Sequence, residues 1–477
     1  MQRKFSTVLI TPAQGLTEVY GKYSKLASTM PALGPCALAA YLIHHHYPVR
    51  IIDADVLRLT SKEVGLDISN EPADLVGIYT HSVNYNVVRK LVSAIKQVNK
   101  SQKIVVGGPH LNFAQVEALE ENEIEFAAKG EGEETLLELV QHLEDGATDF
   151  SEIDGLAWKA VDGEIIVNKD RVRKKELDTL PFPAIHLLPP ISMYHPPLMQ
   201  YKRLPVIDVE TSRGCPYRCS FCETPFGKKM SFYSPEYIAD YLEHLQKKIG
   251  VKEVHFMDDT FTLVESRVFE LCELINKRKI KIPWYCAARV DIKNRDIWKT
   301  MQKAGCWIVA IGVESGNQEI IHNLQKRITI AQVKGAAADI RKAGLALKAF
   351  FIIGNPGETL DTIEETISVA EQIKAHYPVF SLMTPYPGTP LWETADQWGT
   401  LDKKGFDKYL LAADDPVFVP FGLTKEILLA KQKEAFRRNY FNLGMVSRQL
   451  GVFKGFQSLV KIPLGLREAV RLQLNWY

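Results

Sequence analysis

Three cysteines stand close together in the segment 214–222, which reads GCPYRCSFC and has the spacing C-x3-C-x2-C. Thiolates this close on one loop can converge on a single soft metal centre. A [4Fe–4S] cluster held by Cys215, Cys219 and Cys222 leaves one iron open, and catalysis requires an open coordination position. The spacing therefore predicts a catalytic iron–sulfur site. Two alternatives are a zinc site completed by a distant fourth ligand and three unrelated buried thiols. The remaining cysteines are scattered: Cys36, Cys272, Cys286 and Cys306.

The cysteine segment follows the first of six strands that we expect in the second half of the chain. These strands are predicted at 206–209, 253–257, 284–288, 307–313, 349–353 and 379–383. Helices are expected between them, for example at 235–249 and 363–376. Six alternating units indicate a full or partial β/α barrel, because a closed barrel normally has eight.

The N-terminal part alternates strand and helix signals in the same way. Short apolar runs predict strands at 8–10, 49–53, 75–79, 103–106 and 124–128, with helices at 35–46, 86–98 and up to about 143. This pattern predicts a doubly wound parallel sheet, which binds its ligand at the carboxyl ends of the strands.

Two further regions break the alternation. A hairpin is expected at 156–159 and 164–167, around the turn Asp162-Gly163, and a proline-rich linker follows it. After residue 400 the sequence predicts a helix at 425–440 and then an aliphatic, basic end. The expected domains are 1–145 (Rossmann-like), 146–200 (hairpin and linker), 201–400 (barrel) and 401–477 (helical).

Composition excludes several classes of protein. Of the 477 residues, 46% are hydrophobic and 24% charged, which is ordinary for globular chains and rules out disordered, collagenous and coiled-coil proteins. The net charge of +1 gives no broad basic field, so we expect no nucleic-acid partner. No signal peptide or spanning segment is evident, and we expect a protein of the reducing cytoplasm.

The cysteine motif, with the aromatic Phe221 before its third cysteine, resembles that of the radical S-adenosylmethionine (SAM) superfamily. This resemblance implies that the open iron chelates the amino and carboxylate groups of SAM. It also implies that the reduced cluster cleaves SAM to a 5′-deoxyadenosyl radical, which takes a hydrogen atom from the substrate. An electron donor such as flavodoxin or ferredoxin is implied as a partner.

Later motifs follow the predicted strands in the order this superfamily shows. The resemblance implies SAM contacts from seven residues: Asp258 and Asp259 near the amino group, Arg289 at the third strand end, Glu314 and Ser315 near ribose and carboxylate, and Gly354 and Pro356 near adenine. Taken singly, an Asp-Asp pair or a Gly-Asn-Pro-Gly run is more often a turn, and an arginine can simply pair with a carboxylate. The assignment of these residues as SAM contacts rests on the order and spacing of their motifs after the cysteine triad.

A Rossmann-like domain before such a barrel resembles the cobalamin-binding radical SAM subfamily. Matching pieces are PALGP at 31–35, VGGPH at 106–110 and KGEGE at 129–133. The resemblance places the corrin and its nucleotide tail beside Gly107, Gly108, Gly130, Glu131 and Gly132, where glycines permit close approach. Thr80 and Ser82 are expected to donate hydrogen bonds to the tail. Each of these residues can instead be an ordinary loop residue.

The sequence departs from many cobalamin proteins because it has no D-x-H-x-x-G motif. If cobalamin binds, its lower face is expected to lack a histidine ligand, and His110 is a loop residue or a corrin contact. Two other families are excluded. Methylthiotransferases carry a cysteine trio in the N-terminal domain, where this chain has only Cys36, and no G-x-G-x-x-G follows the first strand as in dinucleotide-binding enzymes.

The resemblance implies a cobalamin-dependent radical SAM enzyme that modifies an unactivated carbon of a small molecule, most commonly by methyl transfer. Cyclisation, rearrangement or oxygen insertion in a lipid or tetrapyrrole pathway is an alternative. So are a radical SAM enzyme without cobalamin and a non-catalytic cobalamin carrier, although the intact cysteine motif argues against the carrier. No residue is assigned a catalytic role beyond cofactor binding.

The C-terminal end leaves three interpretations open, one of which is contact with a partner. Its aliphatic residues Leu459, Val460, Leu464 and Leu466 are interleaved with lysine and arginine, as in a helix that lies at a membrane surface, which would suit a lipid-like substrate. A helix packed on the barrel is the preferred alternative.

Overall fold

The computed structural model describes residues 4–13, 29–121, 123–196, 200–403 and 415–452. The chain forms two compact units. The first comprises Met1–Tyr194 with Arg213–Pro216 and Glu223–Tyr233, and the second comprises His195–Ser212, Tyr217–Cys222 and Ser234–Tyr477. The domain boundaries expected at 145, 200 and 400 stay predictions. Across the described ranges, every helix is too short or too polar to cross a bilayer.

The first unit is built on a seven-stranded sheet in the spatial order β2-β1-β3-β4-β5-β6-β7. Strands β1 to β5 are parallel. Their order reverses between β1 and β3, and parallel sheets bind ligands outside the carboxyl ends at such a switch point. The bounds are β1 (Thr7–Thr11), β2 (Val49–Asp53), β3 (Leu75–Tyr79), β4 (Lys103–Gly107), β5 (Phe126–Ala128), β6 (Leu156–Lys159) and β7 (Ile165–Val167).

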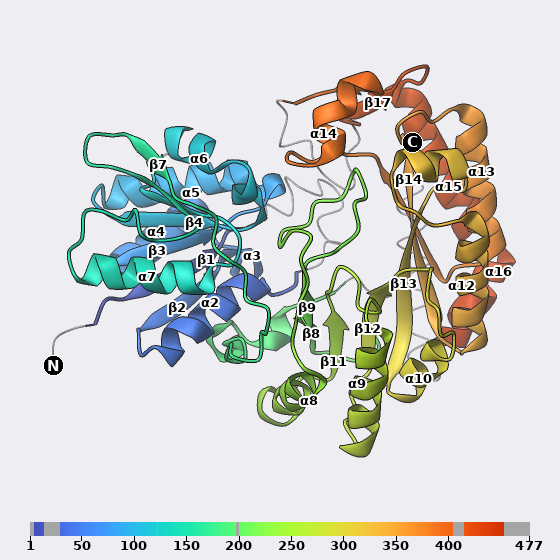
Figure 1. Ribbon diagram of the computed structural model, residues 1–477, viewed down its shortest axis with the longest axis horizontal. Helices are drawn as coiled ribbons and strands as arrows, with labels where there is room; N and C mark the ends of the chain where they lie inside the picture. The colour runs from blue at the N-terminus through green and yellow to red at the C-terminus, as the bar shows by residue number, and fades with distance from the viewer. Residues whose placement is uncertain (1–3, 14–28, 122, 197–199, 404–414, 453–477) are drawn as a thin grey trace. The chain divides into compact units, whose positions relative to one another are not determined.

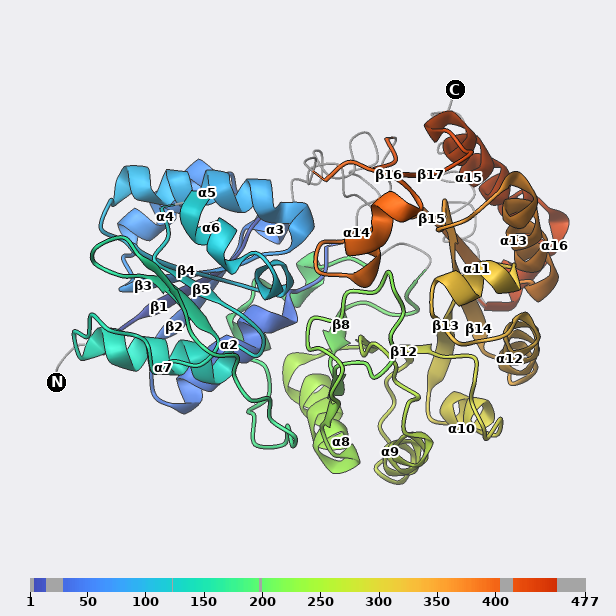
Figure 2. The same cartoon turned by 45° about the horizontal axis from the view of Figure 1, so that its top comes forward.

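Helices cover both faces of this sheet, which confirms the predicted doubly wound fold (Figures 1 and 2). Strand residues alternate between two cores: Val8 and Ile10 pack with helices α4, α5 and α6, whereas Leu9 packs with α2 and α7. The helix expected at 35–46 begins two residues earlier, because Pro35 lies in the first turn, where its missing N–H is not needed. The bounds are α2 (Leu33–His44), α3 (Ala54–Leu57), α4 (Ser61–Asn70), α5 (Tyr85–Val98), α6 (Gln115–Glu121) and α7 (Glu133–Glu144).

The predicted hairpin is present and extends the first sheet. Strands β6 and β7 are antiparallel, and β6 pairs antiparallel with β5. Gly163 in the turn has a φ of +89°, a left-handed conformation that favours glycine.

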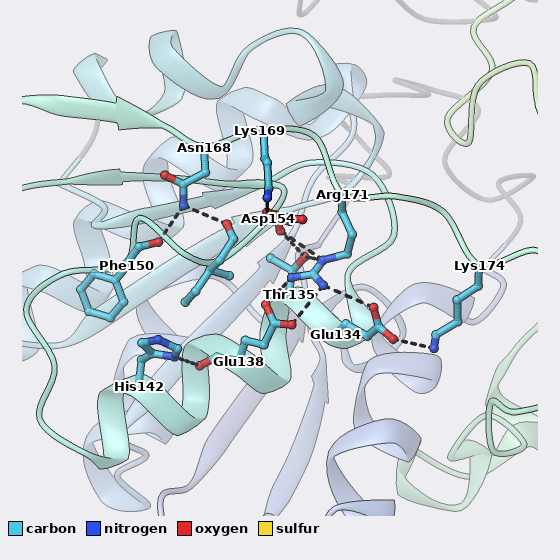
Figure 3. Close-up of polar contacts among 11 residues, drawn as sticks. Glu134, Thr135, Glu138, His142, Phe150, Asp154, Asn168, Lys169, Arg171 and Lys174 are labelled. Atoms are coloured by element: carbon cyan, nitrogen blue, oxygen red, sulfur yellow. Dashed lines mark hydrogen bonds and ion pairs between the residues drawn. The ribbon is translucent and has the colours of Figure 1, made fainter.

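A buried arginine fastens the chain after this hairpin to α7 (Figure 3). The Arg171 Nε donates to the Thr135 Oγ1 at 2.8 Å, and its guanidinium pairs with Glu134 and Glu138. Lys174 Nζ lies 2.5 Å from a Glu134 oxygen. These contacts fix the segment that runs beside the loop between β5 and α7.

The second unit contains a parallel six-stranded sheet in the order β15-β14-β13-β12-β11-β8. Consecutive strands are neighbours throughout, which confirms a partial β/α barrel with six strands. Its bounds are β8 (Val206–Val209), β11 (Glu253–Phe256), β12 (Trp284–Ala288), β13 (Cys306–Glu314), β14 (Ala346–Ile353) and β15 (Tyr377–Leu382). Two short strands, β9 (Ser212–Arg213) and β10 (Ser231–Phe232), pair on either side of the cysteine segment.

Helices lie along one face of this second sheet (Figures 1 and 2). Trp284 and Phe256 face them, with ring centroids 5.3 Å apart, and Cys286 is a neighbour of Cys272 in α9. The helices are α8 (Pro235–His244), which continues as the π-helical turn η6 (Leu245–Ile249), α9 (Glu265–Lys277), α10 (Ile297–Lys303), α11 (Gln318–Asn323), α12 (Ile330–Lys342) and α13 (Leu360–Ile373). The Ser234 hydroxyl caps α8, and Gly250 ends the π turn.

The remaining described elements follow the sheet. They are α14 (Pro390–Thr394), the antiparallel pair β16 (Gly399–Leu401) and β17 (Phe418–Pro420), α15 (Lys425–Tyr440) and α16 (Leu443–Val452). Helix α15 has the predicted bounds and packs on β15, where Gln432 donates to the Phe380 carbonyl. The segment 459–471, predicted as an interfacial or packed helix, lies outside the described residues.

Candidate functional site

The cysteine segment begins within the first unit. Cys215 is 9% exposed, and its backbone N–H donates to the Gly227 carbonyl at 3.1 Å. Gly214 has a φ of +91°, and a Cβ there would lie 2.2 Å from the Lys229 carbonyl. Only glycine fits this turn, so the sequence Gly-Cys at the start of the motif has a steric cause.

Arg213 anchors the same turn through a buried ion-pair cluster. Its guanidinium lies 2.6 Å from a Glu133 oxygen and 3.5 Å from Glu131, and all three side chains are at most 8% exposed. Burial alone would raise the pKa of Glu133, but the Arg213 charge holds it below the usual value. Glu131 also accepts from the Lys174 N–H at 3.1 Å. In this structure Glu131 therefore fastens the β5–α7 loop, and its predicted contact with the corrin stays a prediction.

The second half of the cysteine segment is held within the second unit. The Ser220 N–H donates to the Leu324 carbonyl at 3.0 Å, and the Ser220 carbonyl accepts from the Leu391 N–H at 2.8 Å. Phe221 packs in an apolar cluster with Leu324 and Met383. Cys219 is 9% exposed and Cys222 is partly exposed.

The donor set of this loop suits an iron–sulfur cluster. Three soft sulfur ligands lie within eight residues of one another, and such ligands favour iron–sulfur chemistry over magnesium or calcium. In the described part of the chain, no three His, Cys, Asp or Glu side chains already converge as a preformed metal site. The assignment of Cys215, Cys219 and Cys222 as ligands therefore rests on their chemistry and spacing.

Arg289, directly after β12, contacts the cysteine segment through Tyr217. Its guanidinium carbon lies 3.6 Å from the centre of the Tyr217 ring, inside the motif, and its nitrogens bind the Asp291 carboxylate at 2.9 and 3.0 Å. Burial alone would lower the pKa of Arg289, but Asp291, Tyr217 and Cys219 raise it above the usual value. A cation is thus fixed beside the middle of the cysteine segment.

Asp258, at the end of β11, ties down the strand that leads into the motif. Its carboxylate accepts from the Thr211 N–H and hydroxyl, both at 3.0 Å, and from the Ser212 hydroxyl at 2.6 Å. Burial raises the pKa of Asp258 above its usual value, although Ser212, Arg267 and Thr211 oppose this. The neighbouring Asp259 is exposed. Contact of either carboxylate with SAM stays a prediction.

Glu314, the last residue of β13, has a left-handed backbone conformation that is unfavourable for a residue other than glycine. It has a φ of +65°, the pairing with β14 shifts register between Gly312 and Glu314, and Lys326 Nζ binds its carboxylate at 2.6 Å. Bulges and strained residues of this kind concentrate at functional sites. Ser315, in contrast, is fully buried, and its hydroxyl lies 3.0 Å from the Thr366 hydroxyl of α13. Its local role is to fasten the loop after β13.

The ion pair between Glu314 and Lys326 occupies the space that a side chain at Gly312 would fill. A Cβ at this position would lie 2.3 Å from a Glu314 oxygen and 2.7 Å from Lys326 Nζ. We expect Gly312→Ala to displace both charges and to weaken SAM binding about ten-fold, with no loss of iron. Calorimetric titration with SAM measures this, and Gly335→Ala on α12 is the control because only the mobile end of Arg295 is near it. Unchanged SAM affinity in Gly312→Ala would argue against a SAM site at Glu314.

The turn after β14 is organised by a buried carboxylate that the sequence analysis did not single out. Glu358 is 1% exposed and accepts from the backbone N–H groups of Gly354 and Asn355 at 2.5 and 3.0 Å. The Asn355 Oδ1 is buried and has no hydrogen-bond partner among the described residues. An acceptor left open beside Gly354 and Pro356 suits a ligand that donates hydrogen bonds, as the amino group of adenine does.

Glu358 predicts a pH effect on stability. Burial raises its pKa from 4.5 to about 7, although the hydrogen bonds from Asn355 and Gly354 oppose this. Because the folded pKa lies above the unfolded one, the folded state binds more protons between these values. Stability from this group is present below the unfolded pKa and is lost as the pH rises towards 7, at up to about 1.4 kcal/mol per pH unit. We expect urea unfolding of Glu358→Gln to lack this slope, and the exposed Glu319→Gln to keep it. Equal slopes in wild type and Glu358→Gln would contradict the assignment.

The carboxyl edge of the first sheet carries two glycines with little crowding at their Cβ positions. A Cβ at Gly107 would meet only Ala128, at 3.8 Å, and nothing lies within 4 Å of one at Gly130. Packing of the described chain therefore does not require glycine at 107. At the end of β1, the buried Thr11 hydroxyl has no hydrogen-bond partner within the described ranges. Uncrowded glycines at the end of β4 and after β5, with a spare hydroxyl at the end of β1 beside the switch point, suit a ligand at this edge.

Other predicted residues on this edge have structural roles. A Cβ at Gly108 would lie 2.4 Å from the Thr80 carbonyl, and the Thr80 N–H donates to the Gly107 carbonyl at 2.8 Å. Gly132 is crowded by Leu38, at 3.1 Å from a Cβ. Thr80 and Gly108 thus hold the loops after β3 and β4 together, whatever else they contact.

Two buried histidines also lie on this edge. The Ser82 hydroxyl is 3.1 Å from His110 Nδ1, and the Tyr79 hydroxyl is 2.6 Å from His81 Nε2. The pKa of both imidazoles is lowered to about 4, by burial at His81 and by burial together with the neighbouring His81 at His110. Both are neutral at pH 7, so the edge offers neutral hydrogen-bonding groups. His110 was predicted from the sequence as a loop residue or a corrin contact, whereas no role was predicted for His81.

Comparison with known proteins agrees with both halves of this description. The Radical SAM superfamily profile matches residues 209–370, and the B12 binding domain profile matches residues 23–140. The chain is 32% identical to an uncharacterized methyltransferase of Pyrococcus horikoshii, over 90% of this chain and 92% of that protein. The chain belongs to the cobalamin-binding radical SAM enzymes.

Further relatives extend this finding. An anaerobic magnesium-protoporphyrin IX monomethyl ester cyclase of Rubrivivax gelatinosus is 27% identical over 88% of this radical SAM enzyme and 75% of the cyclase. The fold is that of the radical SAM methyltransferase TsrM of Kitasatospora setae with cobalamin and a [4Fe–4S] cluster bound (TM-score 0.67, 20% identity, 88% of this chain and 80% of TsrM). The cofactors of this enzyme class are a [4Fe–4S] cluster, SAM and cobalamin.

Proposed function

We propose that the protein transfers a methyl group to an unactivated carbon of a small molecule. The observation that carries this proposal is the similarity to a methyltransferase over nine-tenths of both chains, together with uncrowded glycines at the carboxyl edge of the first sheet and a cysteine triad in one chain. The bound cofactors supply the methyl group and the radical chemistry. The tasks left to the protein are binding, orientation and exclusion of water.

Specific residues are assigned to these tasks. Cys215, Cys219 and Cys222 would hold the cluster, and Arg289 would steady the segment between them by packing on the Tyr217 ring. Glu314, Asn355 and the backbone of Gly354 would orient SAM. Gly107 and Gly130 would let the corrin approach the first sheet, with a hydrogen bond from the spare Thr11 hydroxyl. Thr80 and Ser82 would donate to its tail by turning their hydroxyls away from Asn84 and His110. An electron donor such as flavodoxin or ferredoxin is proposed as the partner that reduces the cluster.

A second function is favoured by the cyclase relative, which matches this chain over 88% of its length. In such a reaction the radical abstracts hydrogen, but no methyl group reaches the product. The two proposals therefore differ in what happens to the methyl group of SAM. A lipid-like substrate and membrane contact stay proposals that depend on residues outside the described ranges.

The test uses SAM that carries a deuterated methyl group. The anaerobically reconstituted enzyme, loaded with cobalamin, is incubated with a small-molecule extract and a reductant. We expect equal amounts of S-adenosylhomocysteine and 5′-deoxyadenosine, and one extract component that gains the labelled methyl group. Formation of 5′-deoxyadenosine without S-adenosylhomocysteine would refute methyl transfer and support the cyclase-type reaction.

A further inference from the structure

The residues that directly follow the cysteine motif are attached to the first unit. Residues 223–231, here called the post-cysteine segment, begin at the residue after Cys222 and belong to the same compact unit as the first sheet. The guanidinium of Arg173 donates to the Lys229 carbonyl, and its central carbon lies 5.8 Å from the centre of the Phe226 ring. The chain that leaves the third cysteine is therefore held by the unit that carries the predicted cobalamin site.

Asn112 joins the post-cysteine segment to two loops of the first sheet. It is the last residue of the short 3₁₀ helix η3 (Pro109–Asn112), which follows β4. Its Nδ2 donates to the Pro225 carbonyl at 2.9 Å, and its Oδ1 accepts from the Gly130 N–H at 3.2 Å. The chemistry of the partners fixes this orientation of the amide, because a carbonyl needs a donor and an N–H needs an acceptor. One side chain thus connects the loop after β4, the loop after β5 and the third residue after Cys222.

The same two loops carry the glycines proposed above to contact cobalamin. Gly107 ends β4, one residue before Gly108 and η3, and Gly130 lies in the loop after β5. Gly130 has a φ of +77°, and its N–H is held by Asn112. A ligand that rests on Gly107 and Gly130 reduces the freedom of both loops. It therefore also reduces the freedom of Asn112 and of the Pro225 carbonyl that Asn112 binds.

A second connection runs through Glu131, but it reaches only the loop after β5. The Glu131 carboxylate lies 3.5 Å from a nitrogen of Arg173 and 3.5 Å from one of Arg213. Neither contact involves the loop after β4. Asn112 provides a link that Glu131 does not, because it joins both loops to the post-cysteine segment through two hydrogen bonds of ordinary length.

We infer that Asn112 is a positioning residue that couples the two cofactor sites, so that the assembled cluster strengthens cobalamin binding. The inference rests on the cofactor-binding residues of the proposed function. Coupling of this kind is reciprocal, so bound cobalamin strengthens retention of the cluster by the same factor. A chain that holds one cofactor then binds the other more tightly, which favours the fully loaded enzyme over forms with a single cofactor.

The test compares the affinity for cobalamin with and without the cluster. Full-length protein, either cluster-reconstituted or iron-free, is dialysed anaerobically against a series of hydroxocobalamin concentrations. In wild type we expect the cluster to lower the dissociation constant about ten-fold. Asn112→Asp keeps an acceptor for the Gly130 N–H but cannot donate to the Pro225 carbonyl, and the ratio of the two constants should fall to about three-fold or less. A merely structural role of Asn112 would change both constants equally and leave their ratio unchanged.

The matched control is Asn168→Asp. Asn168 follows β7 in the same unit and also donates to backbone carbonyls, those of Phe150 and Ile153 at 2.7 and 2.8 Å. This variant should keep the wild-type ratio. Asn112→Ala, which lacks both the donor and the acceptor, should also give the low ratio, and it replaces Asn112→Asp if that variant does not fold.

The outcomes separate this inference from the proposed function. Equal affinity of wild type with and without the cluster, or a wild-type ratio in the Asn112 variants, would overturn the coupling and leave the proposed function standing. Wild-type protein that binds no hydroxocobalamin in either form would overturn both, and cobalt analysis of the dialysed protein identifies this result.

Discussion

Alanine at Cys215, Cys219 or Cys222 is expected to abolish cluster assembly and SAM cleavage. Each thiolate supplies one of three iron ligands, and a cluster held by two cysteines cannot keep a single iron open for SAM. After anaerobic reconstitution we expect iron to fall from about four per chain to near zero. 5′-Deoxyadenosine formation should fall to the level of the iron-free protein. Iron analysis and chromatography of the SAM products measure both effects.

The matched control is a cysteine with a different environment. Cys272 in α9 is fully buried in the core, and burial raises the pKa of its thiol to about 12, which makes it a poor metal ligand at neutral pH. Cys272→Ala should keep the cluster and SAM cleavage, at a moderate cost in stability. SAM cleavage that persists in any of the three motif variants would refute the site assignment.

Leucine at Gly107 is expected to remove cobalamin and to leave the cluster in place. The Cβ of the new side chain would meet only Ala128, at 3.8 Å, and we expect the rest of the leucine to fill the space above the sheet. We expect cobalt per chain to fall more than ten-fold, with iron unchanged, and methyl transfer to stop. The corresponding change at Gly108 is unsuitable, because a Cβ there would strike the Thr80 carbonyl.

Gly335→Leu on α12 is the control for added bulk, since only the end of the Arg295 side chain must move. It should retain both metals. Wild-type cobalt content in Gly107→Leu would mean that the corrin does not pass over the end of β4. That result would move the cobalamin site elsewhere on the chain without affecting the cysteine assignment.

The elements that depend on continuous apolar runs were predictable. Strand 75–79 has its expected bounds, because it is an apolar run between the polar residues Asp74 and Thr80. Strand 206–209 also has its expected bounds, although Asp208 interrupts its apolar run. The strand expected at 124–128 begins only at Phe126. At Glu125 the side-chain carboxylate accepts a hydrogen bond from the Ile104 N–H at 2.9 Å. This bond replaces a backbone hydrogen bond between the two strands. The strand expected at 349–353 begins three residues earlier and includes Lys348, a charge that periodicity does not place in a buried strand.

Side-chain partners distant in sequence were not predictable. No local pattern links Arg289 to Tyr217, Glu314 to Lys326, or Arg213 to Glu133, because tertiary packing alone brings these pairs together. Asp258 illustrates the consequence: its motif suggested a cofactor contact, and its oxygens accept hydrogen bonds from Thr211 and Ser212. Glu358 had a local signal, since an acid three residues after Asn355 can cap the turn, but the sequence analysis did not use it.

The central claim is that one chain binds an iron–sulfur cluster and cobalamin together. The most direct test is anaerobic purification with cobalamin supplied, followed by cluster reconstitution, a UV–visible spectrum and analysis of iron and cobalt. We expect about four irons and one cobalt per chain, and spectral bands of both cofactors. About four irons without cobalt would contradict the account and leave a radical SAM enzyme whose N-terminal sheet only shapes the substrate site.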